Sequence, residues 1–154
     1  MSVLIAEDNI INQKVLHRIL ASLGLKHIDI VENGKLAVER EAAKEYDVIF
    51  MDYQVSRYHF DLQIEPYQIL TCFVCHRCQQ MPVMDGIEAT KLITRRDDIG
   101  HPVPIIAFLT AHAAEEFEKQ ATEAGAAYFL TKPFSKDDIS EFFKLLPALQ
   151  CVRG

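Results

Sequence analysis

Short apolar runs alternate along the chain with longer segments in which apolar residues recur every three or four positions. Runs of about five apolar residues without polar alternation are typical of strands buried on both faces. The sequence therefore predicts five buried strands, at Ser2 to Ala6, Ile28 to Val31, Asp47 to Met51, Val103 to Leu109 and Ala127 to Thr131.

The segments between these runs are predicted helices. Asn9 is a candidate N-cap for the first helix, and Gly24 is its expected stop. The apolar face of this helix is expected at Ile11, Val15, Ile19 and Leu23. Further helices are predicted from Asn33-Gly34 to about Lys44, from Gly86 to Arg96, and from Ala113 to Ala124 with Phe117, Ala121 and Ala124 inward.

A last helix is predicted after Ser135, which forms a partial capping box with Asp138. Its apolar stripe is Ile139, Phe142, Phe143, Leu146 and Leu149. Strands that alternate with helices predict an α/β fold, here a flavodoxin-like, doubly wound, five-stranded parallel sheet of order 2-1-3-4-5. We expect one domain over residues 1–149, with an insertion at 55–80 after the third strand, and a tail at 150–154.

Composition excludes some classes of function. The net charge of −6 argues against nucleic acid as a direct partner. Every apolar run is shorter than the ~20 residues that span a bilayer, so no membrane association is expected. Acidic residues come too early at the N-terminus for a signal peptide, which predicts a cytoplasmic location.

Chemically capable side chains stand at the ends of four predicted strands. Glu7 and Asp8 follow the first, Asp52 ends the third, Thr110 ends the fourth and Lys132 ends the fifth. Taken singly, such residues are often only helix caps or solvated loop residues. Together, at one edge of a parallel sheet, they favour a site where carboxylates bind Mg²⁺ and Asp52 acts as a nucleophile toward a phosphoryl group.

Several motifs at these strand ends resemble those of the response-regulator receiver domain. They are A-E-D-N at 6–9, M-D-Y-Q at 51–54, M-P-V-M-D-G at 81–86, L-T-A at 109–111 and T-K-P-F at 131–134. The resemblance covers Val3 to about Leu149, apart from the insertion. The opening E-D-N-x-x-N-Q-K-V is most similar to receivers at the C-terminus of hybrid histidine kinases.

The resemblance implies a role for each site residue. Asp52 would be the phosphoacceptor, and Glu7, Asp8, Asp52 and the backbone carbonyl of Gln54 would bind Mg²⁺. Lys132 would contact the phosphate, and Pro133 would follow a cis peptide bond. Thr110 would be the switch hydroxyl and Phe129 the switch aromatic, although Phe129 lacks the hydroxyl of a tyrosine.

The function implied is phosphorelay signal transduction. The domain would accept its phosphoryl group from a histidine kinase or a histidine phosphotransfer protein. It would be a phosphoacceptor rather than an enzyme, and the resemblance to C-terminal receivers is in keeping with a fragment of a hybrid histidine kinase. Its output would pass through protein contacts on the face of the fourth helix, fifth strand and fifth helix.

Two departures from the family pattern affect these expectations. The 26 residues from Val55 to Gln80 interrupt the signature directly after the phosphoacceptor, and without them it reads M-D-Y-Q-M-P-V-M-D-G. One hypothesis for the origin of these 26 residues is a retained intron or a gene-model error. The alternative is a genuine loop insertion. The fourth strand also carries one residue more than the family pattern, which displaces Thr110 unless a bulge absorbs it. A receiver-like interaction module inactivated by the insertion is therefore an alternative function.

The insertion also contains three cysteines. C-F-V-C-H at 72–76 matches a haem-attachment pattern, and Cys72, Cys75, Cys78 and His76 could hold Zn²⁺ with His59. A metal-binding module built on Cys72 to Cys78 is thus a second alternative. The spacing is tighter than in usual zinc sites, so cysteines without a ligand are the favoured interpretation.

Overall fold

The five predicted strands form one sheet. The computed structural model describes residues 1–53, 84–95, 102–111 and 115–153. Within these ranges the strands pair in parallel in the order β2-β1-β3-β4-β5, which confirms the predicted fold class. The strands are β1 (Ser2–Ala6), β2 (His27–Val31), β3 (Val48–Asp52), β4 (Ile105–Thr110) and β5 (Tyr128–Thr131). The helices are α1 (Ile10–Ser22), α2 (Gly34–Ala43), α3 (Gly86–Thr94), α4 (Glu115–Ala124) and α5 (Lys136–Arg153).

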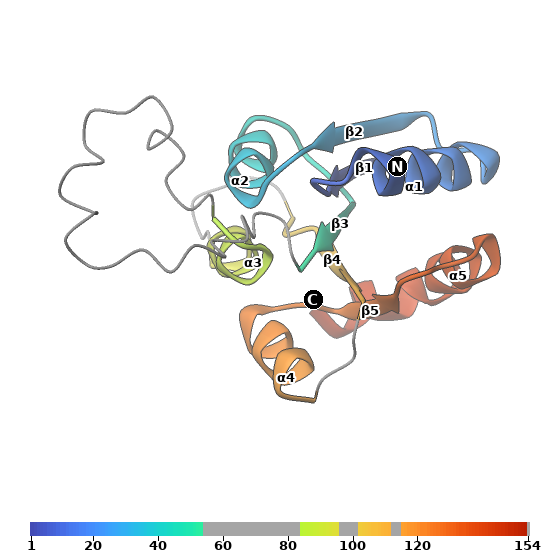
Figure 1. The fold of residues 1–154 in the computed structure, drawn as a ribbon. Coiled ribbons are helices and arrows are strands. Elements are labelled where there is room, and N and C mark those ends of the chain that lie inside the picture. Colours follow the sequence, from blue (N-terminus) through green and yellow to red (C-terminus); the bar gives the residue numbers. More distant parts are fainter. Residues whose placement is uncertain (54–83, 96–101, 112–114, 154) are drawn as a thin grey trace, which may run out of the picture.

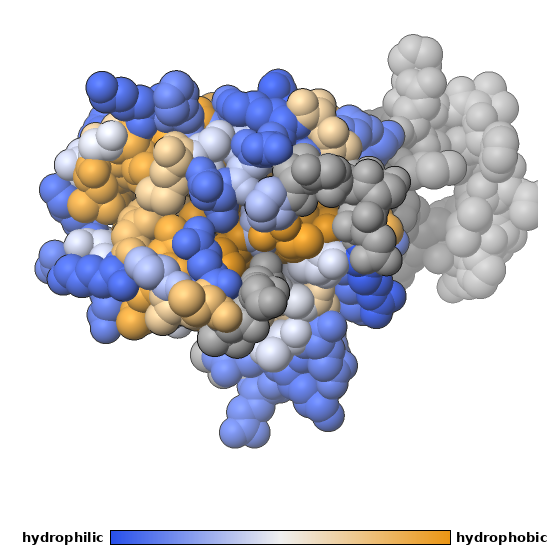
Figure 2. All heavy atoms as spheres, turned by 180° about the vertical axis from the view of Figure 1, so that it is seen from behind, coloured by the Kyte–Doolittle hydropathy of each residue, from blue (hydrophilic) through white to orange (hydrophobic). Residues whose placement is uncertain are grey.

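Helices cover both faces of the sheet. Helices α1 and α5 lie on one face, while α2, α3 and α4 lie on the other (Figure 1). The residues of β3 and β4 are all buried, as the unbroken apolar runs predicted. On the surface, polar side chains surround smaller apolar patches (Figure 2). In the described part of the chain, no helix combines the length and apolar character needed to cross a membrane.

Local signals set the helix ends where the sequence indicated. The side chain of Asn9 accepts hydrogen bonds from the backbone N–H groups of Ile11 and Asn12, which confirms it as the N-cap of α1. Ser135 and Asp138 exchange side-chain and backbone hydrogen bonds before α5, as in a capping box. Helix α5 continues to Arg153, into the segment that the sequence analysis treated as a tail.

The predicted buried face of α1 was partly wrong. Ile11 is 68% exposed and Val15 is 44% exposed, whereas Leu16 and Leu20 are buried against the sheet. A helix turns about 100° per residue, so Ile11 and Val15 lie more than about 90° around the helix from Leu16 and Leu20 and are directed away from the sheet. The sheet-facing positions of the first turns are polar instead, because they adjoin the carboxyl edge of the sheet.

The fourth strand begins two residues later than predicted. Val103 lies between Pro102 and Pro104, and a proline has no N–H to donate to a neighbouring strand. The first ladder bond is therefore that of Ile105, whose N–H donates to Asp47 O at 3.0 Å. The register of β4 with β3 and β5 is continuous to Leu109 and Thr110, so no bulge absorbs the extra residue.

Candidate functional site

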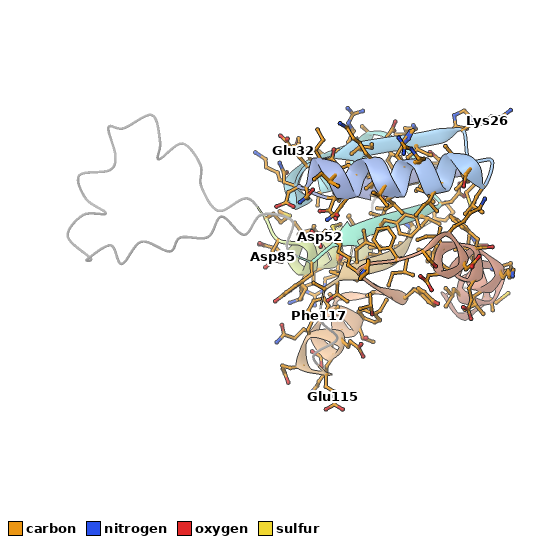
Figure 3. All side chains as sticks on the ribbon, turned by 45° about the vertical axis from the view of Figure 1, so that its right-hand side comes forward. Lys26, Glu32, Asp52, Asp85, Glu115 and Phe117 are labelled. Carbon is orange, nitrogen blue, oxygen red and sulfur yellow. The ribbon has the colours of Figure 1, made fainter. Side chains whose placement is uncertain are left out.

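The carboxyl ends of β1, β3 and β5 bring three charged residues together. Glu7 follows β1, Asp52 is the last residue of β3, and Lys132 follows β5. Strands β1 and β3 are neighbours although β2 lies between them in sequence, so the site stands where the chain reverses its direction of winding. Ligands of doubly wound sheets bind at this position. Figure 3 labels Asp52 at this end of β3, close to Asp85 before α3.

Lys132 forms ion pairs with both carboxylates. Its Nζ lies 2.6 Å from Glu7 Oε2 and 2.9 Å from Asp52 Oδ1. The side chains of Glu7 and Asp52 are 1% and 6% exposed, and that of Lys132 is 18% exposed. Buried charges persist only when they are paired, so the ammonium neutralises part of a negative centre that would otherwise be unstable. We call Glu7, Asp52 and Lys132 the charged triad.

Asp8 adds a third carboxylate beside this triad. One carboxylate oxygen from each of Glu7, Asp8 and Asp52 lies within 4.8 Å of the others. Two ligands of one Mg²⁺ ion are at most ~4.2 Å apart, because each lies ~2.1 Å from the metal. The oxygens are therefore close to the spacing that a hard cation requires, and their number and type fit Mg²⁺.

Burial and the neighbouring charge of Glu7 raise the pKa of Asp8, while Lys132 partly opposes this shift. Both raising causes disfavour the charged form of Asp8 when no cation is present. A bound divalent cation would relieve this repulsion between carboxylates. The electrostatics of the acidic group thus agree with its geometry in favouring a cation.

The structure places some of the other predicted site residues, and the rest lie outside the residues it describes. Thr110 is 2% exposed, and its carbonyl accepts a hydrogen bond from Lys132 N–H at 2.7 Å. Asp52 pairs with Leu109, and Thr110 is the next residue along β4. Side chains alternate between the two faces of a sheet, so Thr110 lies on the face of Phe108 and Phe129, and Asp52 lies on the other face. The Lys132–Pro133 peptide bond is cis, as expected. Gln54 and the cluster Cys72 to Cys78, with His59 and His76, lie outside the described residues.

The start of α3 packs directly on the carboxyl end of β3. A Cβ atom on Gly86 would lie 2.5 Å from the backbone oxygen of Asp52 and 3.1 Å from a side-chain carbon of Met51. The 2.5 Å contact is shorter than real Cβ atoms show, and its partner is a backbone atom, so only glycine allows α3 to approach this closely. Asp85 caps the helix by accepting from Glu88 N–H at 2.8 Å. The M-D-G motif at 84–86 did not by itself indicate this packing role.

Four aromatic rings form a second group at the same end of the sheet. The ring centroids of Tyr53 and Phe117 are 4.0 Å apart, and Phe117 also contacts Phe108 at 5.8 Å and Phe129 at 6.3 Å. Phe117 is labelled on α4 in Figure 3. We call Tyr53, Phe108, Phe117 and Phe129 the aromatic cluster. It joins the residue after Asp52 to α4 and β5, a connection that the sequence analysis did not predict.

Comparison with known proteins agrees with this fold and site. A family model described as "Response regulator receiver domain" matches residues 78–144. The osmosensing histidine protein kinase SLN1 of Saccharomyces cerevisiae is 30% identical over 141 residues, which are 88% of this chain and 9% of that protein. Hybrid signal transduction histidine kinase K of Dictyostelium discoideum is 30% identical over 145 residues, or 90% of this chain and 10% of that protein. The chain thus spans about a tenth of the length of these relatives.

A solved structure gives the same result. The receiver domain of sensor histidine kinase PA1611 from Pseudomonas aeruginosa PAO1 has a TM-score of 0.66 and 28% identity, covering 93% of each chain. Its description records a magnesium ion coordinated in its active site cleft. The chemotaxis protein CheY4 of Vibrio cholerae, at 20% identity and a TM-score of 0.68, shares the fold.

The fold and the acidic strand ends define the class of receiver-type α/β domains. With these comparisons, the chain is similar to response regulator receiver domains: the family model matches residues 78–144, and the matching curated relatives include histidine kinases, several of them hybrid, that match 85–92% of this chain but only 3–12% of their own length.

Proposed function

We propose that Asp52 accepts a phosphoryl group from a phosphohistidine donor in a Mg²⁺-dependent reaction. The observation that carries this proposal is the position of Lys132, whose ammonium lies within 3 Å of both Glu7 and Asp52. A single cation held between two buried carboxylates at a sheet edge is the arrangement that phosphoryl transfer requires, because the reaction is governed by positioning and charge neutralisation.

In the proposed reaction, a carboxylate oxygen of Asp52 attacks the phosphorus of the donor. The new O–P bond makes an acyl phosphate, and the N–P bond of the phosphohistidine breaks with its electron pair left on the imidazole nitrogen. Lys132 neutralises charge on the phosphoryl oxygens. Glu7, Asp8, Asp52 and the carbonyl of Gln54 would hold Mg²⁺, which supplies further neutralisation of phosphoryl charge when it is bound.

Thr110 and Phe129 are the proposed switch residues. Phe129 belongs to the aromatic cluster and therefore contacts both β4 and α4 through its ring. A change at the carboxyl end of β4 would reach α4 through this packing. The donor, as a histidine kinase or histidine phosphotransfer protein, is proposed from the relatives' type. A cytoplasmic location and the absence of enzymatic activity remain predictions.

Incubation of the purified chain with acetyl phosphate tests the proposal. We expect a mass increase of one phosphoryl group with Mg²⁺ and none when a chelator removes the metal. Asp52→Asn should abolish the increase, because an amide is a poor nucleophile. Asp47→Asn is the matched control, since Asp47 precedes the opposite end of β3 and hydrogen-bonds Ser2 N–H at 2.6 Å. Equal uptake by wild type and Asp52→Asn would exclude Asp52 as the acceptor.

A further inference from the structure

The Glu7 carboxylate is held by donors on two sides. Its Oε2 accepts from Lys132 Nζ, as described above. Its Oε1 accepts from the backbone N–H of Asn9 at 3.2 Å and from the side-chain amide Nδ2 of Asn12 at 3.2 Å. The backbone oxygen of Glu7 accepts from Gln13 Nε2 at 2.6 Å. The first turns of α1 thus bind both the side chain and the main chain of Glu7.

Asn12 and Gln13 occupy positions where an amphipathic helix would otherwise place apolar side chains. They lie on the side of α1 that carries Leu16 and Leu20 toward the sheet, and both are partly buried. Asparagine is a poorer helix former than leucine, so its presence inside a helix costs local stability. The amide of Asn12 offsets this cost through its hydrogen bond to a buried carboxylate, which is stronger than a bond between neutral groups.

The geometry points to Asn12 as a positioning residue that fixes the Glu7 carboxylate for cation binding, an inference that rests on the proposed function. With Oε1 directed to α1, Oε2 faces Lys132 and Asp52. Without the Asn12 amide, Asn9 N–H is the single donor to Oε1 among the hydrogen bonds found in the described residues. The Glu7 carboxylate could then rotate, and its charge would no longer be fixed beside Asp8 and Asp52.

Calorimetric titration with MgCl₂ alone, without a phosphoryl donor, tests this inference. Asn12→Leu removes the amide but keeps a side chain of similar size and improves helix propensity. We expect the Kd for Mg²⁺ to rise about tenfold, which corresponds to ~1.4 kcal/mol. The urea midpoint should stay at the wild-type value or rise. Asn12→Gln, which keeps the amide donor, should bind Mg²⁺ within about twofold of wild type.

Gln120→Leu is the matched control. Gln120 also donates an amide hydrogen bond to a glutamate, Glu116 Oε1 at 3.3 Å, but on the exposed face of α4. Its Kd for Mg²⁺ should be unchanged. If leucine is not accommodated at position 12, Asn12→Ala removes the same amide and carries the same expectation. Wild-type Mg²⁺ affinity in a folded Asn12→Leu or Asn12→Ala variant would overturn the inference alone. No Mg²⁺ binding by the wild type would overturn the proposed function and this inference with it.

Discussion

The charged triad and the aromatic cluster lie at the same edge of the sheet but are built in different ways. Each member of the triad is the last residue of a strand or directly follows one, so the topology alone brings together Glu7 and Lys132, which are 125 positions apart. The aromatic cluster takes its rings from a turn, two strands and a helix. The triad therefore depends on the order of strands and on charge, whereas the cluster depends on side-chain packing.

This difference predicts that the two groups respond separately to substitution. Changes in the triad should alter both folding stability and phosphoryl chemistry, because its charges are buried and also form the site. Changes in the aromatic cluster should alter stability while leaving cation binding in place. The variants below are ordered from the largest expected effect to the smallest.

Lys132→Ala should have the largest effect. It leaves the buried carboxylates of Glu7 and Asp52 without their shared ammonium, and loss of one partner of a buried ion pair typically costs about 3–5 kcal/mol. We expect that decrease in the free energy of unfolding by urea denaturation without Mg²⁺, together with loss of phosphoryl uptake. Added Mg²⁺ should recover part of the stability, because it binds the folded state.

Lys44→Ala is the control for this variant. Lys44 pairs with Asp29 at 2.7 Å, but the two side chains are 46% and 31% exposed. Exposed pairs contribute about 0–1 kcal/mol, so this variant should unfold close to wild type. A decrease as large as that of Lys132→Ala would show that burial of the triad is not what makes its ion pairs important.

Deletion of residues 55–80 should come next. The described residues on both sides meet at Asp52, since Tyr53 N–H donates to Leu109 O at 3.2 Å and Gly86 packs on the Asp52 carbonyl. The deletion shortens the connection between Tyr53 and Met84 roughly eightfold, which is about three halvings of its length. At ~0.6 kcal/mol for each factor of two in loop length, the free energy of unfolding should rise by about 2 kcal/mol. Urea denaturation measures it, and phosphoryl uptake should be retained or increased. If the deletion variant does not fold, residues 55–80 are needed for folding and do not merely interrupt a domain that is complete without them.

Phe117→Leu tests the aromatic cluster. It keeps an apolar side chain but removes the ring contacts with Tyr53 and Phe108, which predicts a loss of about 1–2 kcal/mol. The Kd for Mg²⁺ and the extent of phosphorylation by acetyl phosphate should match wild type. Phe143→Leu, in the core on the opposite sheet face, is a control for ring loss far from the cluster. A large loss of Mg²⁺ affinity in Phe117→Leu would mean that the two groups are not separate.

Asp8→Asn should have the smallest effect on the free energy of unfolding, and the size of this effect depends on pH. Burial and Glu7 raise the pKa of Asp8 above 3.8 in the folded state, so the charged form destabilises the metal-free fold at neutral pH. The variant should therefore be more stable than wild type at pH 7 without Mg²⁺. The difference should vanish as the pH falls below 3.8, where Asp8 is protonated in both states. Mg²⁺ binding should weaken, and lower stability of the variant at pH 7 would contradict the assigned cause.

The sequence predicted those parts of the molecule that depend on the alternation of strands with helices and on the residues at the strand ends. The order of the strands and the meeting of Glu7, Asp52 and Lys132 follow from a parallel sheet with buried strands. The buried face of α1 was harder, because apolar Ile11 and Val15 are exposed beside the site while polar Asn12 faces Glu7. An asparagine on the inner side of a helix that follows an acidic strand end was the signal that could have indicated this contact.

The aromatic cluster could not be predicted in the same way. The contact between Tyr53 and Phe117 depends on how α4 lies over β4 and β5, and periodicity does not specify helix placement. Gly86 is similar, because its close approach to Asp52 depends on the position of α3. Sequence reasoning therefore located the chemistry of the site but not the packing that surrounds it.

The nucleophilic role of Asp52 is the central claim, and chemical trapping tests it most directly. Borohydride reduces an aspartyl phosphate to homoserine, which peptide mass spectrometry can locate after phosphorylation by a phosphohistidine donor in the presence of Mg²⁺. The account predicts homoserine at position 52 and an unmodified side chain at Asp8. Phosphorylated protein that yields homoserine at another aspartate, or no homoserine at all, would contradict it.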